Sequence, residues 1–250
     1  MNEIMKDIVI ELKNKFNNIK SMGWIESHRS GDTGIGKTLE DLLDKKEDNK
    51  SDPDYKGIEL KSQRTATSSM ITLFTKSPEH PNQANTLLRT EYGNENENNM
   101  KILHTTISAK DFNTHISGND FKILIDKEKQ KIKILIKKHS TGEIIDGDIF
   151  WSFSGIEEKL SNKLSYVAYI TADEKKEKGK TFFKFEKMKI ITGLNMRKFI
   201  NALEKGDILV DIRIGVYNSG KNKGKTHDHG TGFRITYENL MKYADAEEVE

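Results

Sequence analysis

The residues best suited to do chemistry lie in one short stretch of the chain. Asp54 follows a proline, which favours a turn or the start of a strand, and Glu59 and Lys61 follow within a short alternating run. Side chains alternate between the two faces of a strand, so Glu59 and Lys61 should share one face while Ile58 and Leu60 share the other. The apolar pair would then face a core and the charged pair a cleft.

Two carboxylates and a lysine at this spacing suit a hard divalent cation. Mg²⁺ binds through one or two protein carboxylates and keeps positions open for water and a phosphate oxygen. Asp54 and Glu59 supply the carboxylates, and the carbonyl of Leu60 lies between the acidic and basic side chains. Lys61 can orient or deprotonate an attacking water, or stabilise charge on a phosphate. The same short pattern also arises by chance in a chain of which 32% is charged.

A helix before this strand should carry a further carboxylate, Glu40. Leu39, Leu42 and Leu43 recur at the i, i+3, i+4 spacing of one helical stripe. Glu40 lies off this stripe and is therefore free to point at the strand.

The residues before this helix, 31–38, formally match the phosphate-binding loop G-x-x-x-x-G-K-[ST], and residues 208–211 resemble its acidic partner strand. Such a loop requires a buried apolar strand directly before it. Residues 26–30 are all polar, and the later strands alternate as in half-exposed antiparallel sheets, which disfavours a nucleotide hydrolase. The loop is better interpreted as a glycine-rich helix entry whose amides, with Lys37, can hold a DNA phosphate.

A second group of polar side chains collects on two predicted strands near the C-terminus. Arginine pairs bidentately with guanine O6 and N7, aspartate accepts from cytosine N4, and histidine donates or accepts according to its tautomer. The group therefore suits a site that contains G·C pairs. A two-histidine metal site and an ordinary solvated hairpin with an Asp–Arg pair are the alternatives. Its members are Asp211, Arg213, His227, Asp228, His229 and Arg234.

A basic loop joins the same two strands. Lys221, Lys223 and Lys225 lie there among glycines, a pattern typical of phosphate contacts, which add affinity without sequence information. Lys76, at the end of another predicted strand, is a further candidate contact. Exposed lysines are also often only solvated.

Length and composition limit the remaining possibilities. A chain of 250 residues fits one large domain or two lobes and can bury a core, and a net charge of +2 does not indicate any partner by itself. The absence of cysteine excludes disulfides and thiolate zinc sites. No segment approaches the roughly 20 apolar residues of a membrane span, so we expect a cytoplasmic protein with no membrane partner.

The hydrophobic periodicity predicts both helices and antiparallel hairpins, and so an α+β protein. Helices are expected at residues 4–19, 38–43, 156–164, 196–205 and 238–243. Strands are expected at residues 58–61, 70–76, 121–125, 131–136, 149–153, 166–171, 181–185, 207–217 and 233–235.

Taken together, the motifs resemble a known family. Asp54 with Glu59-Leu60-Lys61 resembles the PD-(D/E)XK signature of restriction-type nucleases, and Glu40 resembles the extra acidic residue of their MutH-like branch. Longer runs are similar to the MvaI/BcnI family of type II restriction endonucleases, and in particular to its MvaI-like members. These runs lie at residues 31–43, 73–78, 84–86, 210–215 and 219–231, while residues 101–203 match least. The run K-T-H-D-H-G-T, residues 225–231, is far more specific than the catalytic signature.

The resemblance implies a Mg²⁺-dependent, sequence-specific endonuclease that acts on double-stranded DNA. A mixed or antiparallel PD-(D/E)XK core and a second, DNA-recognition lobe would lie around a DNA cleft, with approximate bounds of 1–110 and 111–250. Asp54, Glu59 and the Leu60 carbonyl would hold the metal. Lys61 would position or activate the water, and Glu40 would complete the acidic site directly or through a water on the metal.

Family targets are C-C-N-G-G sites with a restricted central pair, and the MvaI-like match implies A or T there. The resemblance further implies a monomer that cuts the strands one after the other, and a cognate DNA methyltransferase in the same system. Two rival hypotheses remain. A MutH-like strand-nicking repair enzyme shares the catalytic motif, although the C-terminal match favours restriction. A DNA-binding protein without hydrolysis is disfavoured by the intact Asp54, Glu59 and Lys61.

Overall fold

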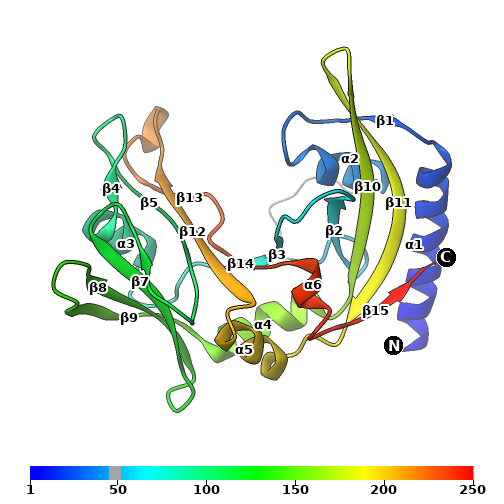
Figure 1. Ribbon diagram of the computed structural model, residues 1–250. Coiled ribbons are helices and arrows are strands. Elements are labelled where there is room, and N and C mark those ends of the chain that lie inside the picture. Colours follow the sequence, from blue (N-terminus) through cyan, green and yellow to red (C-terminus); the bar gives the residue numbers. More distant parts are fainter. Residues whose placement is uncertain (45–51, 250) are drawn as a thin grey trace. The chain divides into compact units, whose positions relative to one another are not determined.

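The computed structural model describes residues 1–44 and 52–249, and the chain divides into two compact units (Figure 1). Unit 1 comprises Met1–Ile71, Ser161–Leu194 and Ala244–Glu250, and unit 2 comprises Thr72–Leu160 and Asn195–Tyr243. This division differs from the boundary expected near residue 110. The physical reason is strand pairing, because residues from 167 onward return to hydrogen-bond with the strand that begins at Glu59.

Unit 1 contains a five-stranded sheet in which the strand of the acidic residues is paired on one side. The order is β1 (Ile25–Glu26), β11 (Lys180–Thr192), β10 (Val167–Glu177) and β2 (Glu59–Arg64), with β15 (Asp245–Glu248) pairing β11. β2 and β10 run parallel, with Glu59 opposite Val167 and Lys61 opposite Tyr169. The remaining pairs are antiparallel. β10 and β11 extend as a long hairpin beyond the end of β2 (Figure 1).

Two amphipathic helices cover the apolar face of this sheet. α1 (Glu3–Ser21) begins at Asn2, whose side chain accepts a hydrogen bond from Met5 N, and it buries Leu12, Phe16 and Ile19. α2 (Gly34–Leu42) packs against β2. The apolar residues of both helices join Ile58, Leu60 and the inner side chains of β10 and β11 in one core.

Unit 2 contains a six-stranded sheet centred on the predicted strand near residue 210. The order is β3 (Ile71–Thr75), β14 (Gly232–Ile235), β12 (Ile208–Val216), β5 (Lys101–Ile107) and β4 (Asn94–Glu95), with β13 (Thr226–Asp228) pairing β12. Ile208, Val210, Ile212, Ile214 and Val216 of β12 are buried while Arg213 is exposed, as the alternation predicts.

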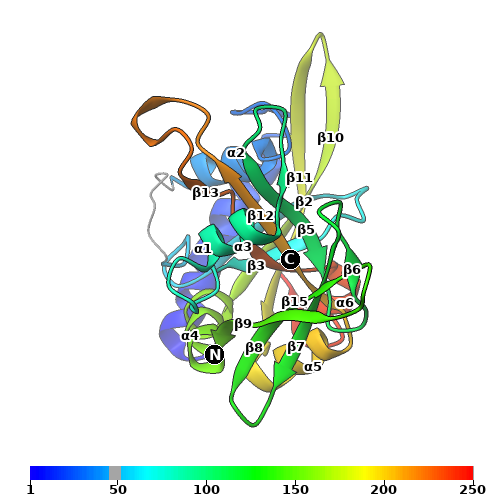
Figure 2. The same ribbon diagram turned by 90° about the vertical axis from the view of Figure 1, so that its left-hand side faces the viewer.

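A second, four-stranded sheet of unit 2 contains the predicted hairpin of residues 121–136 (Figure 2). Its order is β6 (Asn113–Thr114), β7 (Asn119–Asp126), β8 (Lys131–Lys138) and β9 (Ile144–Ser152). The other elements of the chain are helical: α3 (Ala84–Tyr92), α4 (Phe153–Leu164), α5 (Met196–Glu204), the 3₁₀ turn η1 (Gly220–Asn222) and α6 (Tyr237–Leu240). α4 begins in unit 2 and ends in unit 1. Mixed sheets and helices confirm the predicted α+β class.

The glycine-rich loop before α2 does not have the setting of a nucleotide-binding loop. The strand before it, β1, has two residues and pairs antiparallel with β11 at the margin of the sheet. Gly34 is required by close packing, because an added Cβ would lie 2.4 Å from the carbonyl oxygen of Arg29. Within the described residues, no helix is long and apolar enough to cross a membrane.

Candidate active site

The structure brings Asp54, Glu59 and Lys61 together in unit 1. Lys61 Nζ lies 2.8 Å from Glu59 Oε1, so the two side chains share one face of β2 as predicted. Asp54 comes from the turn before β2, and its Oδ2 accepts a 3.0 Å hydrogen bond from Leu60 N. Ile58 and Leu60 point into the core on the other face. Strand alternation thus places the charged side chains on one side and their apolar neighbours on the other.

A second lysine, not predicted from the sequence, completes the surroundings of Glu59. Lys163, in the last turn of α4, places Nζ 2.9 Å from Glu59 Oε2. The same ammonium donates a 2.8 Å hydrogen bond to the carbonyl oxygen of Asp52. Glu59 is 5% exposed, and a buried carboxylate needs such cationic partners.

Asp54 has less compensation for its charge than Glu59. Burial raises the pKa of Asp54 most, and the negative charge of Glu59 raises it further. The hydrogen bond from Leu60 N and the charges of Lys163 and Lys61 oppose these effects without cancelling them. The pair of carboxylates therefore retains an electrostatic preference for an additional cation.

These residues fit a divalent metal ion by the chemistry of their donors. Mg²⁺ uses one or two carboxylates and takes its remaining ligands from water and substrate oxygens. Asp54 and Glu59 supply two carboxylates, close enough that the charge of Glu59 raises the pKa of Asp54. In the described part of the chain, no three His, Cys, Asp or Glu side chains gather as a complete metal-binding group. Water and phosphate oxygens would have to complete the coordination.

Glu40, the further predicted acidic residue, lies on the helix that packs against β2. It lies on α2, whose apolar residues pack in the core with Leu60, on the side of β2 opposite Glu59 and Lys61. Its helix neighbour Gly36 also faces that side, since an added Cβ would lie 3.7 Å from Ser62 Oγ. Whether Glu40 completes the acidic site directly or through a water stays a prediction.

Lys37, the predicted phosphate contact of the glycine-rich loop, lies within the first turns of α2. Its Nζ is 2.7 Å from Asp41 Oδ1, and His28 Nδ1 lies 3.0 Å from the other oxygen of the same carboxylate. The hydrogen bond from Lys37, followed by that from His28, lowers the pKa of Asp41. The charge of Lys37 is thus already partly neutralised within the helix.

Unit 2 assembles most of the predicted base-reading residues on one face of its larger sheet. Asp211 Oδ2 lies 2.7 Å from Arg234 Nη1 and 3.0 Å from Arg213 Nε, and Asp211 Oδ1 accepts from Thr106 Oγ1. Arg213 is the more exposed of the two arginines, with 53% of its side chain accessible against 27% for Arg234. One carboxylate thus orients two guanidinium groups. Three of its roughly four acceptor positions are used in doing so.

Asp228, a further predicted base-reading residue, has a carboxylate that is hydrogen-bonded inside the protein. Oδ1 accepts hydrogen bonds from Gly230 N and Thr231 N, and Oδ2 accepts from Ser77 Oγ and Asn85 Nδ2. Burial alone would raise the pKa of Asp228, but these four bonds outweigh it and lower the pKa. All of its acceptor positions are filled. In this structure Asp228 fixes the loop that carries His227 and His229, and its contact with a base stays a prediction.

The histidines on either side of Asp228 form a ring cluster. His227 stacks on Tyr217 at 4.3 Å between centroids and lies 4.2 Å from His229. His104, on β5 opposite Arg213, makes an edge contact with His229. Burial, followed by the charges of His227 and His104, lowers the pKa of His229. A neutral imidazole offers one donor and one acceptor, which suits contact with base edges.

The lysines predicted as phosphate contacts fall into two groups. Lys76 lies 2.9 Å from Glu79 and is mostly covered, so its charge has an internal partner. Lys221, Lys223 and Lys225 are exposed in the β12–β13 loop, and no carboxylate of the described residues pairs with them. The loop lysines thus have no acidic partner, within the described ranges, that competes with a phosphate, whereas the charge of Lys76 is partly neutralised by Glu79.

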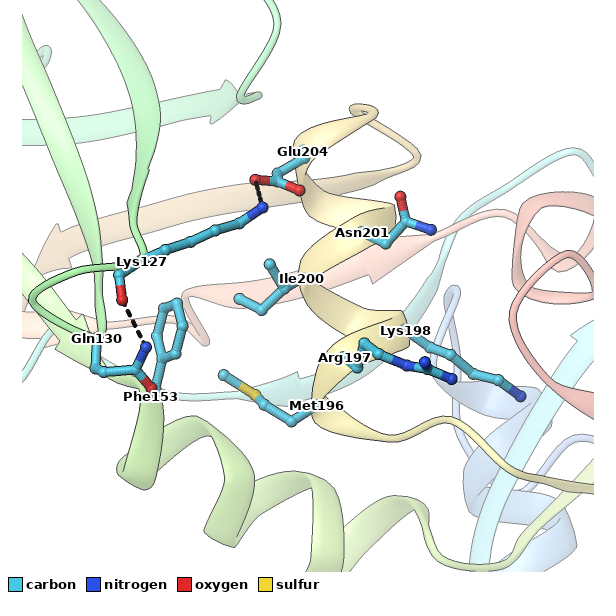
Figure 3. Close-up of a pocket in the computed structure, with 9 residues that line it drawn as sticks. All are labelled: Lys127, Gln130, Phe153, Met196, Arg197, Lys198, Ile200, Asn201 and Glu204. Atoms are coloured by element: carbon cyan, nitrogen blue, oxygen red, sulfur yellow. Dashed lines mark hydrogen bonds and ion pairs between the residues drawn. The ribbon is translucent and has the colours of Figure 1, made fainter.

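A cavity of about 730 Å³ in unit 2 involves none of the predicted site residues (Figure 3). Phe153, Met196 and Ile200 form its apolar lining, and an ion pair of 2.7 Å between Lys127 and Glu204 lies at one end. This cavity is therefore separate from the chemistry proposed for the acidic pair.

Two residues with a place in these sites were not predicted from the sequence. His104 lies on β5 in register with Arg213, so the alternation of residues 101–107 was a usable signal. Lys163 gave no such signal, because its partners Glu59 and Asp52 lie far away in the sequence and only the fold brings them together.

Comparisons with known proteins agree with the family resemblance that the sequence motifs indicate. The family model of the MvaI/BcnI restriction endonuclease family matches residues 13–242. The chain is 43% identical to the protein in the structure "Restriction endonuclease MvaI-cognate DNA substrate complex", with a TM-score of 0.91 and full coverage of both chains. It is also 43% identical to "Restriction endonuclease MvaI in the absence of DNA", with a TM-score of 0.67 over 100% of this chain and 99% of that one. Comparison with curated proteins finds no match.

Proposed function

Because the chain belongs to the MvaI/BcnI restriction endonuclease family and is a site-specific DNA nuclease, we propose that Asp54, Glu59 and Lys61 form its Mg²⁺-dependent hydrolytic centre. The observation that carries this proposal is their convergence. Lys61 Nζ lies 2.8 Å from Glu59 Oε1. Asp54 accepts a hydrogen bond from the backbone N–H of the residue between them. Asp54, Glu59 and the Leu60 carbonyl would hold the metal, with Glu40 acting directly or through a water.

The reaction is hydrolysis of a phosphodiester by direct attack of water. The water oxygen forms a bond to phosphorus, the bond to the leaving sugar oxygen breaks, and that oxygen gains a proton to balance the one lost by the water. Lys61 is placed to orient the water and to stabilise charge that develops on the phosphate. When bound, Mg²⁺ supplies Lewis acidity toward the phosphate oxygens.

Target recognition is proposed to reside in unit 2. Arg213 and Arg234, oriented by Asp211, are suited to guanine, and His227 and His229 supply further donors and acceptors. The site is expected to be C-C-N-G-G with A or T at the centre, because the chain is 43% identical to MvaI in two solved structures. Exposed Lys221, Lys223 and Lys225 are proposed to grip phosphates, with smaller contributions from the paired Lys37 and Lys76.

The partner is proposed to be double-stranded DNA, cut by one copy of the chain. One structural neighbour is described as a complex of MvaI with cognate DNA. A methyltransferase that protects the same site is expected to accompany the nuclease.

Plasmid cleavage tests the hydrolytic centre. Glu59→Gln and Lys61→Ala should each lower the cleavage rate by at least about 10²–10³-fold, the usual cost of removing a group that stabilises the transition state. Both variants should retain binding of a C-C-A-G-G duplex, because the altered groups act on the phosphate. EDTA should abolish cleavage by the parent protein.

The matched control is Glu157→Gln, which alters an exposed carboxylate on α4 in the same way. It should cleave at the parent rate. Near-parent cleavage by Glu59→Gln or Lys61→Ala would refute the assignment of the site.

A further inference from the structure

Lys163 makes two contacts that join the segments carrying the acidic pair. Its ammonium bonds to Glu59 Oε2 on β2 and to the carbonyl oxygen of Asp52, two residues before Asp54. Its side chain is 16% exposed, so the contacts are not those of a fully solvated lysine. Lys163 thus ties the turn that presents Asp54 to the strand that presents Glu59.

The same geometry leaves both oxygens of Glu59 in ion pairs. Lys61 Nζ lies 2.8 Å from Oε1, and Lys163 Nζ lies 2.9 Å from Oε2. A metal ion that uses Glu59 as a ligand must therefore displace one of the two ammonium groups or share an oxygen with it. Of the two, Lys163 has a second anchor, the Asp52 carbonyl, that remains when its contact with Glu59 is lost.

We propose that Lys163 is a positioning residue that occupies Glu59 Oε2 while the metal is absent and yields that oxygen to the divalent cation. This inference rests on the proposed function of the acidic pair. An ammonium on a flexible four-carbon stem can withdraw by rotation, and a carboxylate prefers Mg²⁺ or Mn²⁺ to a monovalent cation. Lys163 thereby keeps the site assembled without metal, and it also competes with the metal.

Binding of Mn²⁺ to the DNA-free protein tests the competition without reference to activity. Free Mn²⁺ gives a six-line electron paramagnetic resonance signal that weakens on binding, which yields Kd directly. Removing the ammonium with Lys163→Met should lower the Kd for Mn²⁺ about three- to tenfold, the scale of one partly exposed ion pair. The Mg²⁺ concentration for half-maximal plasmid cleavage should fall by a similar factor. Lys163→Arg, which keeps the positive charge, should restore the parent Kd.

The matched control is Lys159→Met, one turn earlier on α4, which should leave the Kd unchanged. Circular dichroism and thermal unfolding verify that the variants fold. If Lys163→Met does not fold, the Kd for Mn²⁺ is measured on Lys163→Gln, which also lacks the charge but retains a donor for the Asp52 carbonyl. An unchanged or higher Kd in the charge-free variant overturns the proposal, as does a lack of Mn²⁺ binding in both parent and variant. Cleavage of plasmid by the parent protein with Mg²⁺, measured on the same preparation, distinguishes failure of the Lys163 proposal from failure of the proposed hydrolytic centre. If the parent cleaves, only the role of Lys163 is refuted. If the parent does not cleave, the proposed function is refuted.

Discussion

At the scale of single residues, Asp54 is held where its own charge is unfavourable. Burial, then repulsion from Glu59, raises the pKa of Asp54 in the folded protein. A carboxyl group whose folded pKa is raised lowers stability as pH rises from its unfolded pKa through its folded pKa. The cost is therefore present above the folded pKa of Asp54 and disappears in acid. Metal-free protein should carry a destabilising charge at this one position.

Asp54→Asn should consequently stabilise the metal-free protein at neutral pH while abolishing cleavage. Asparagine keeps a carbonyl oxygen for the hydrogen bond from Leu60 N but carries no charge. Thermal unfolding in EDTA should give the variant a higher Tm than the parent near neutral pH. The difference should shrink as pH falls toward about 3.9, the ordinary pKa of aspartate. Added Mg²⁺ should raise the Tm of the parent alone.

Asp52→Asn is the control for this experiment, since it removes an exposed carboxylate from the same turn. It should change neither the Tm in EDTA nor the response to Mg²⁺. A variant at position 54 that is less stable than the parent at every pH would show that the charge of Asp54 is well compensated.

Strand alternation sufficed to predict that Glu59 and Lys61 share one face of β2, whereas two other parts of the sites depended on the fold. Nothing in the sequence near Lys163 indicates Glu59 as its partner. Asp228 lies between two histidines and was interpreted as a third reading group, although a glycine two residues later is typical of an aspartate that bonds its own loop backbone. The glycine therefore indicated a structural role for Asp228, but the two flanking histidines favoured its interpretation as a base-reading residue.

At the scale of elements, the amphipathic helices and hairpins were predictable because their periodicity is strong. α3 was not predicted, and its N-cap explains why: Gln83 adopts a left-handed conformation (φ 60°) and makes no side-chain cap. β15 is a short strand of exposed, mostly charged residues, so it has no hydrophobic pattern at all. β11 is longer than the predicted 181–185, since lysines on its solvated side interrupt the apolar run.

The β12–β13 region combines two kinds of cation that should respond differently to mutation. Arg213 is fixed by Asp211, whereas Lys223 is exposed in the loop. Arg213→Ala should cost about 1–3 kcal/mol in binding a C-C-A-G-G duplex and little in binding random DNA. Lys223→Ala should weaken both duplexes alike and reduce the slope of log K against log salt by about 1.

Fluorescence anisotropy at several salt concentrations measures both effects. Lys178→Ala, in the exposed turn between β10 and β11 of unit 1, serves as a charge-matched control. If Arg213→Ala weakens cognate and random DNA equally, Arg213 is a phosphate contact and does not read a base.

At the scale of the whole molecule, the chain has one Asp54–Glu59–Lys61 set for two DNA strands. A monomer with one such set can attack one strand in one bound orientation, and a nearly palindromic site can be entered in two. Nicked circular plasmid should therefore accumulate before linear product. A duplex with one uncleavable strand should still be nicked on the other. Sedimentation of Glu59→Gln with a cognate duplex should show one protein per DNA.

Dimeric restriction enzymes solve the same problem by matching a two-fold protein to a two-fold site. Two proteins per duplex, together with linear product that forms without a nicked intermediate, would establish that arrangement here. The nuclease assignment itself would be unaffected by that result.

The interleaving of the two units also fixes an order of events on the ribosome. β2 carries Glu59 and Lys61, but its sheet neighbour β10 and the α4 turn with Lys163 are encoded only after Thr72–Leu160 of unit 2. At about 5–20 residues per second, several seconds of synthesis separate the acidic strand from the partners that hold it. A nascent chain or a prematurely terminated fragment that ends before α4 therefore lacks an assembled hydrolytic centre. A cell that makes this nuclease is thus shielded from fragments that end before α4, whereas a fragment that ends between β11 and β12 would keep the acidic strand and its partners without the segment proposed to read DNA.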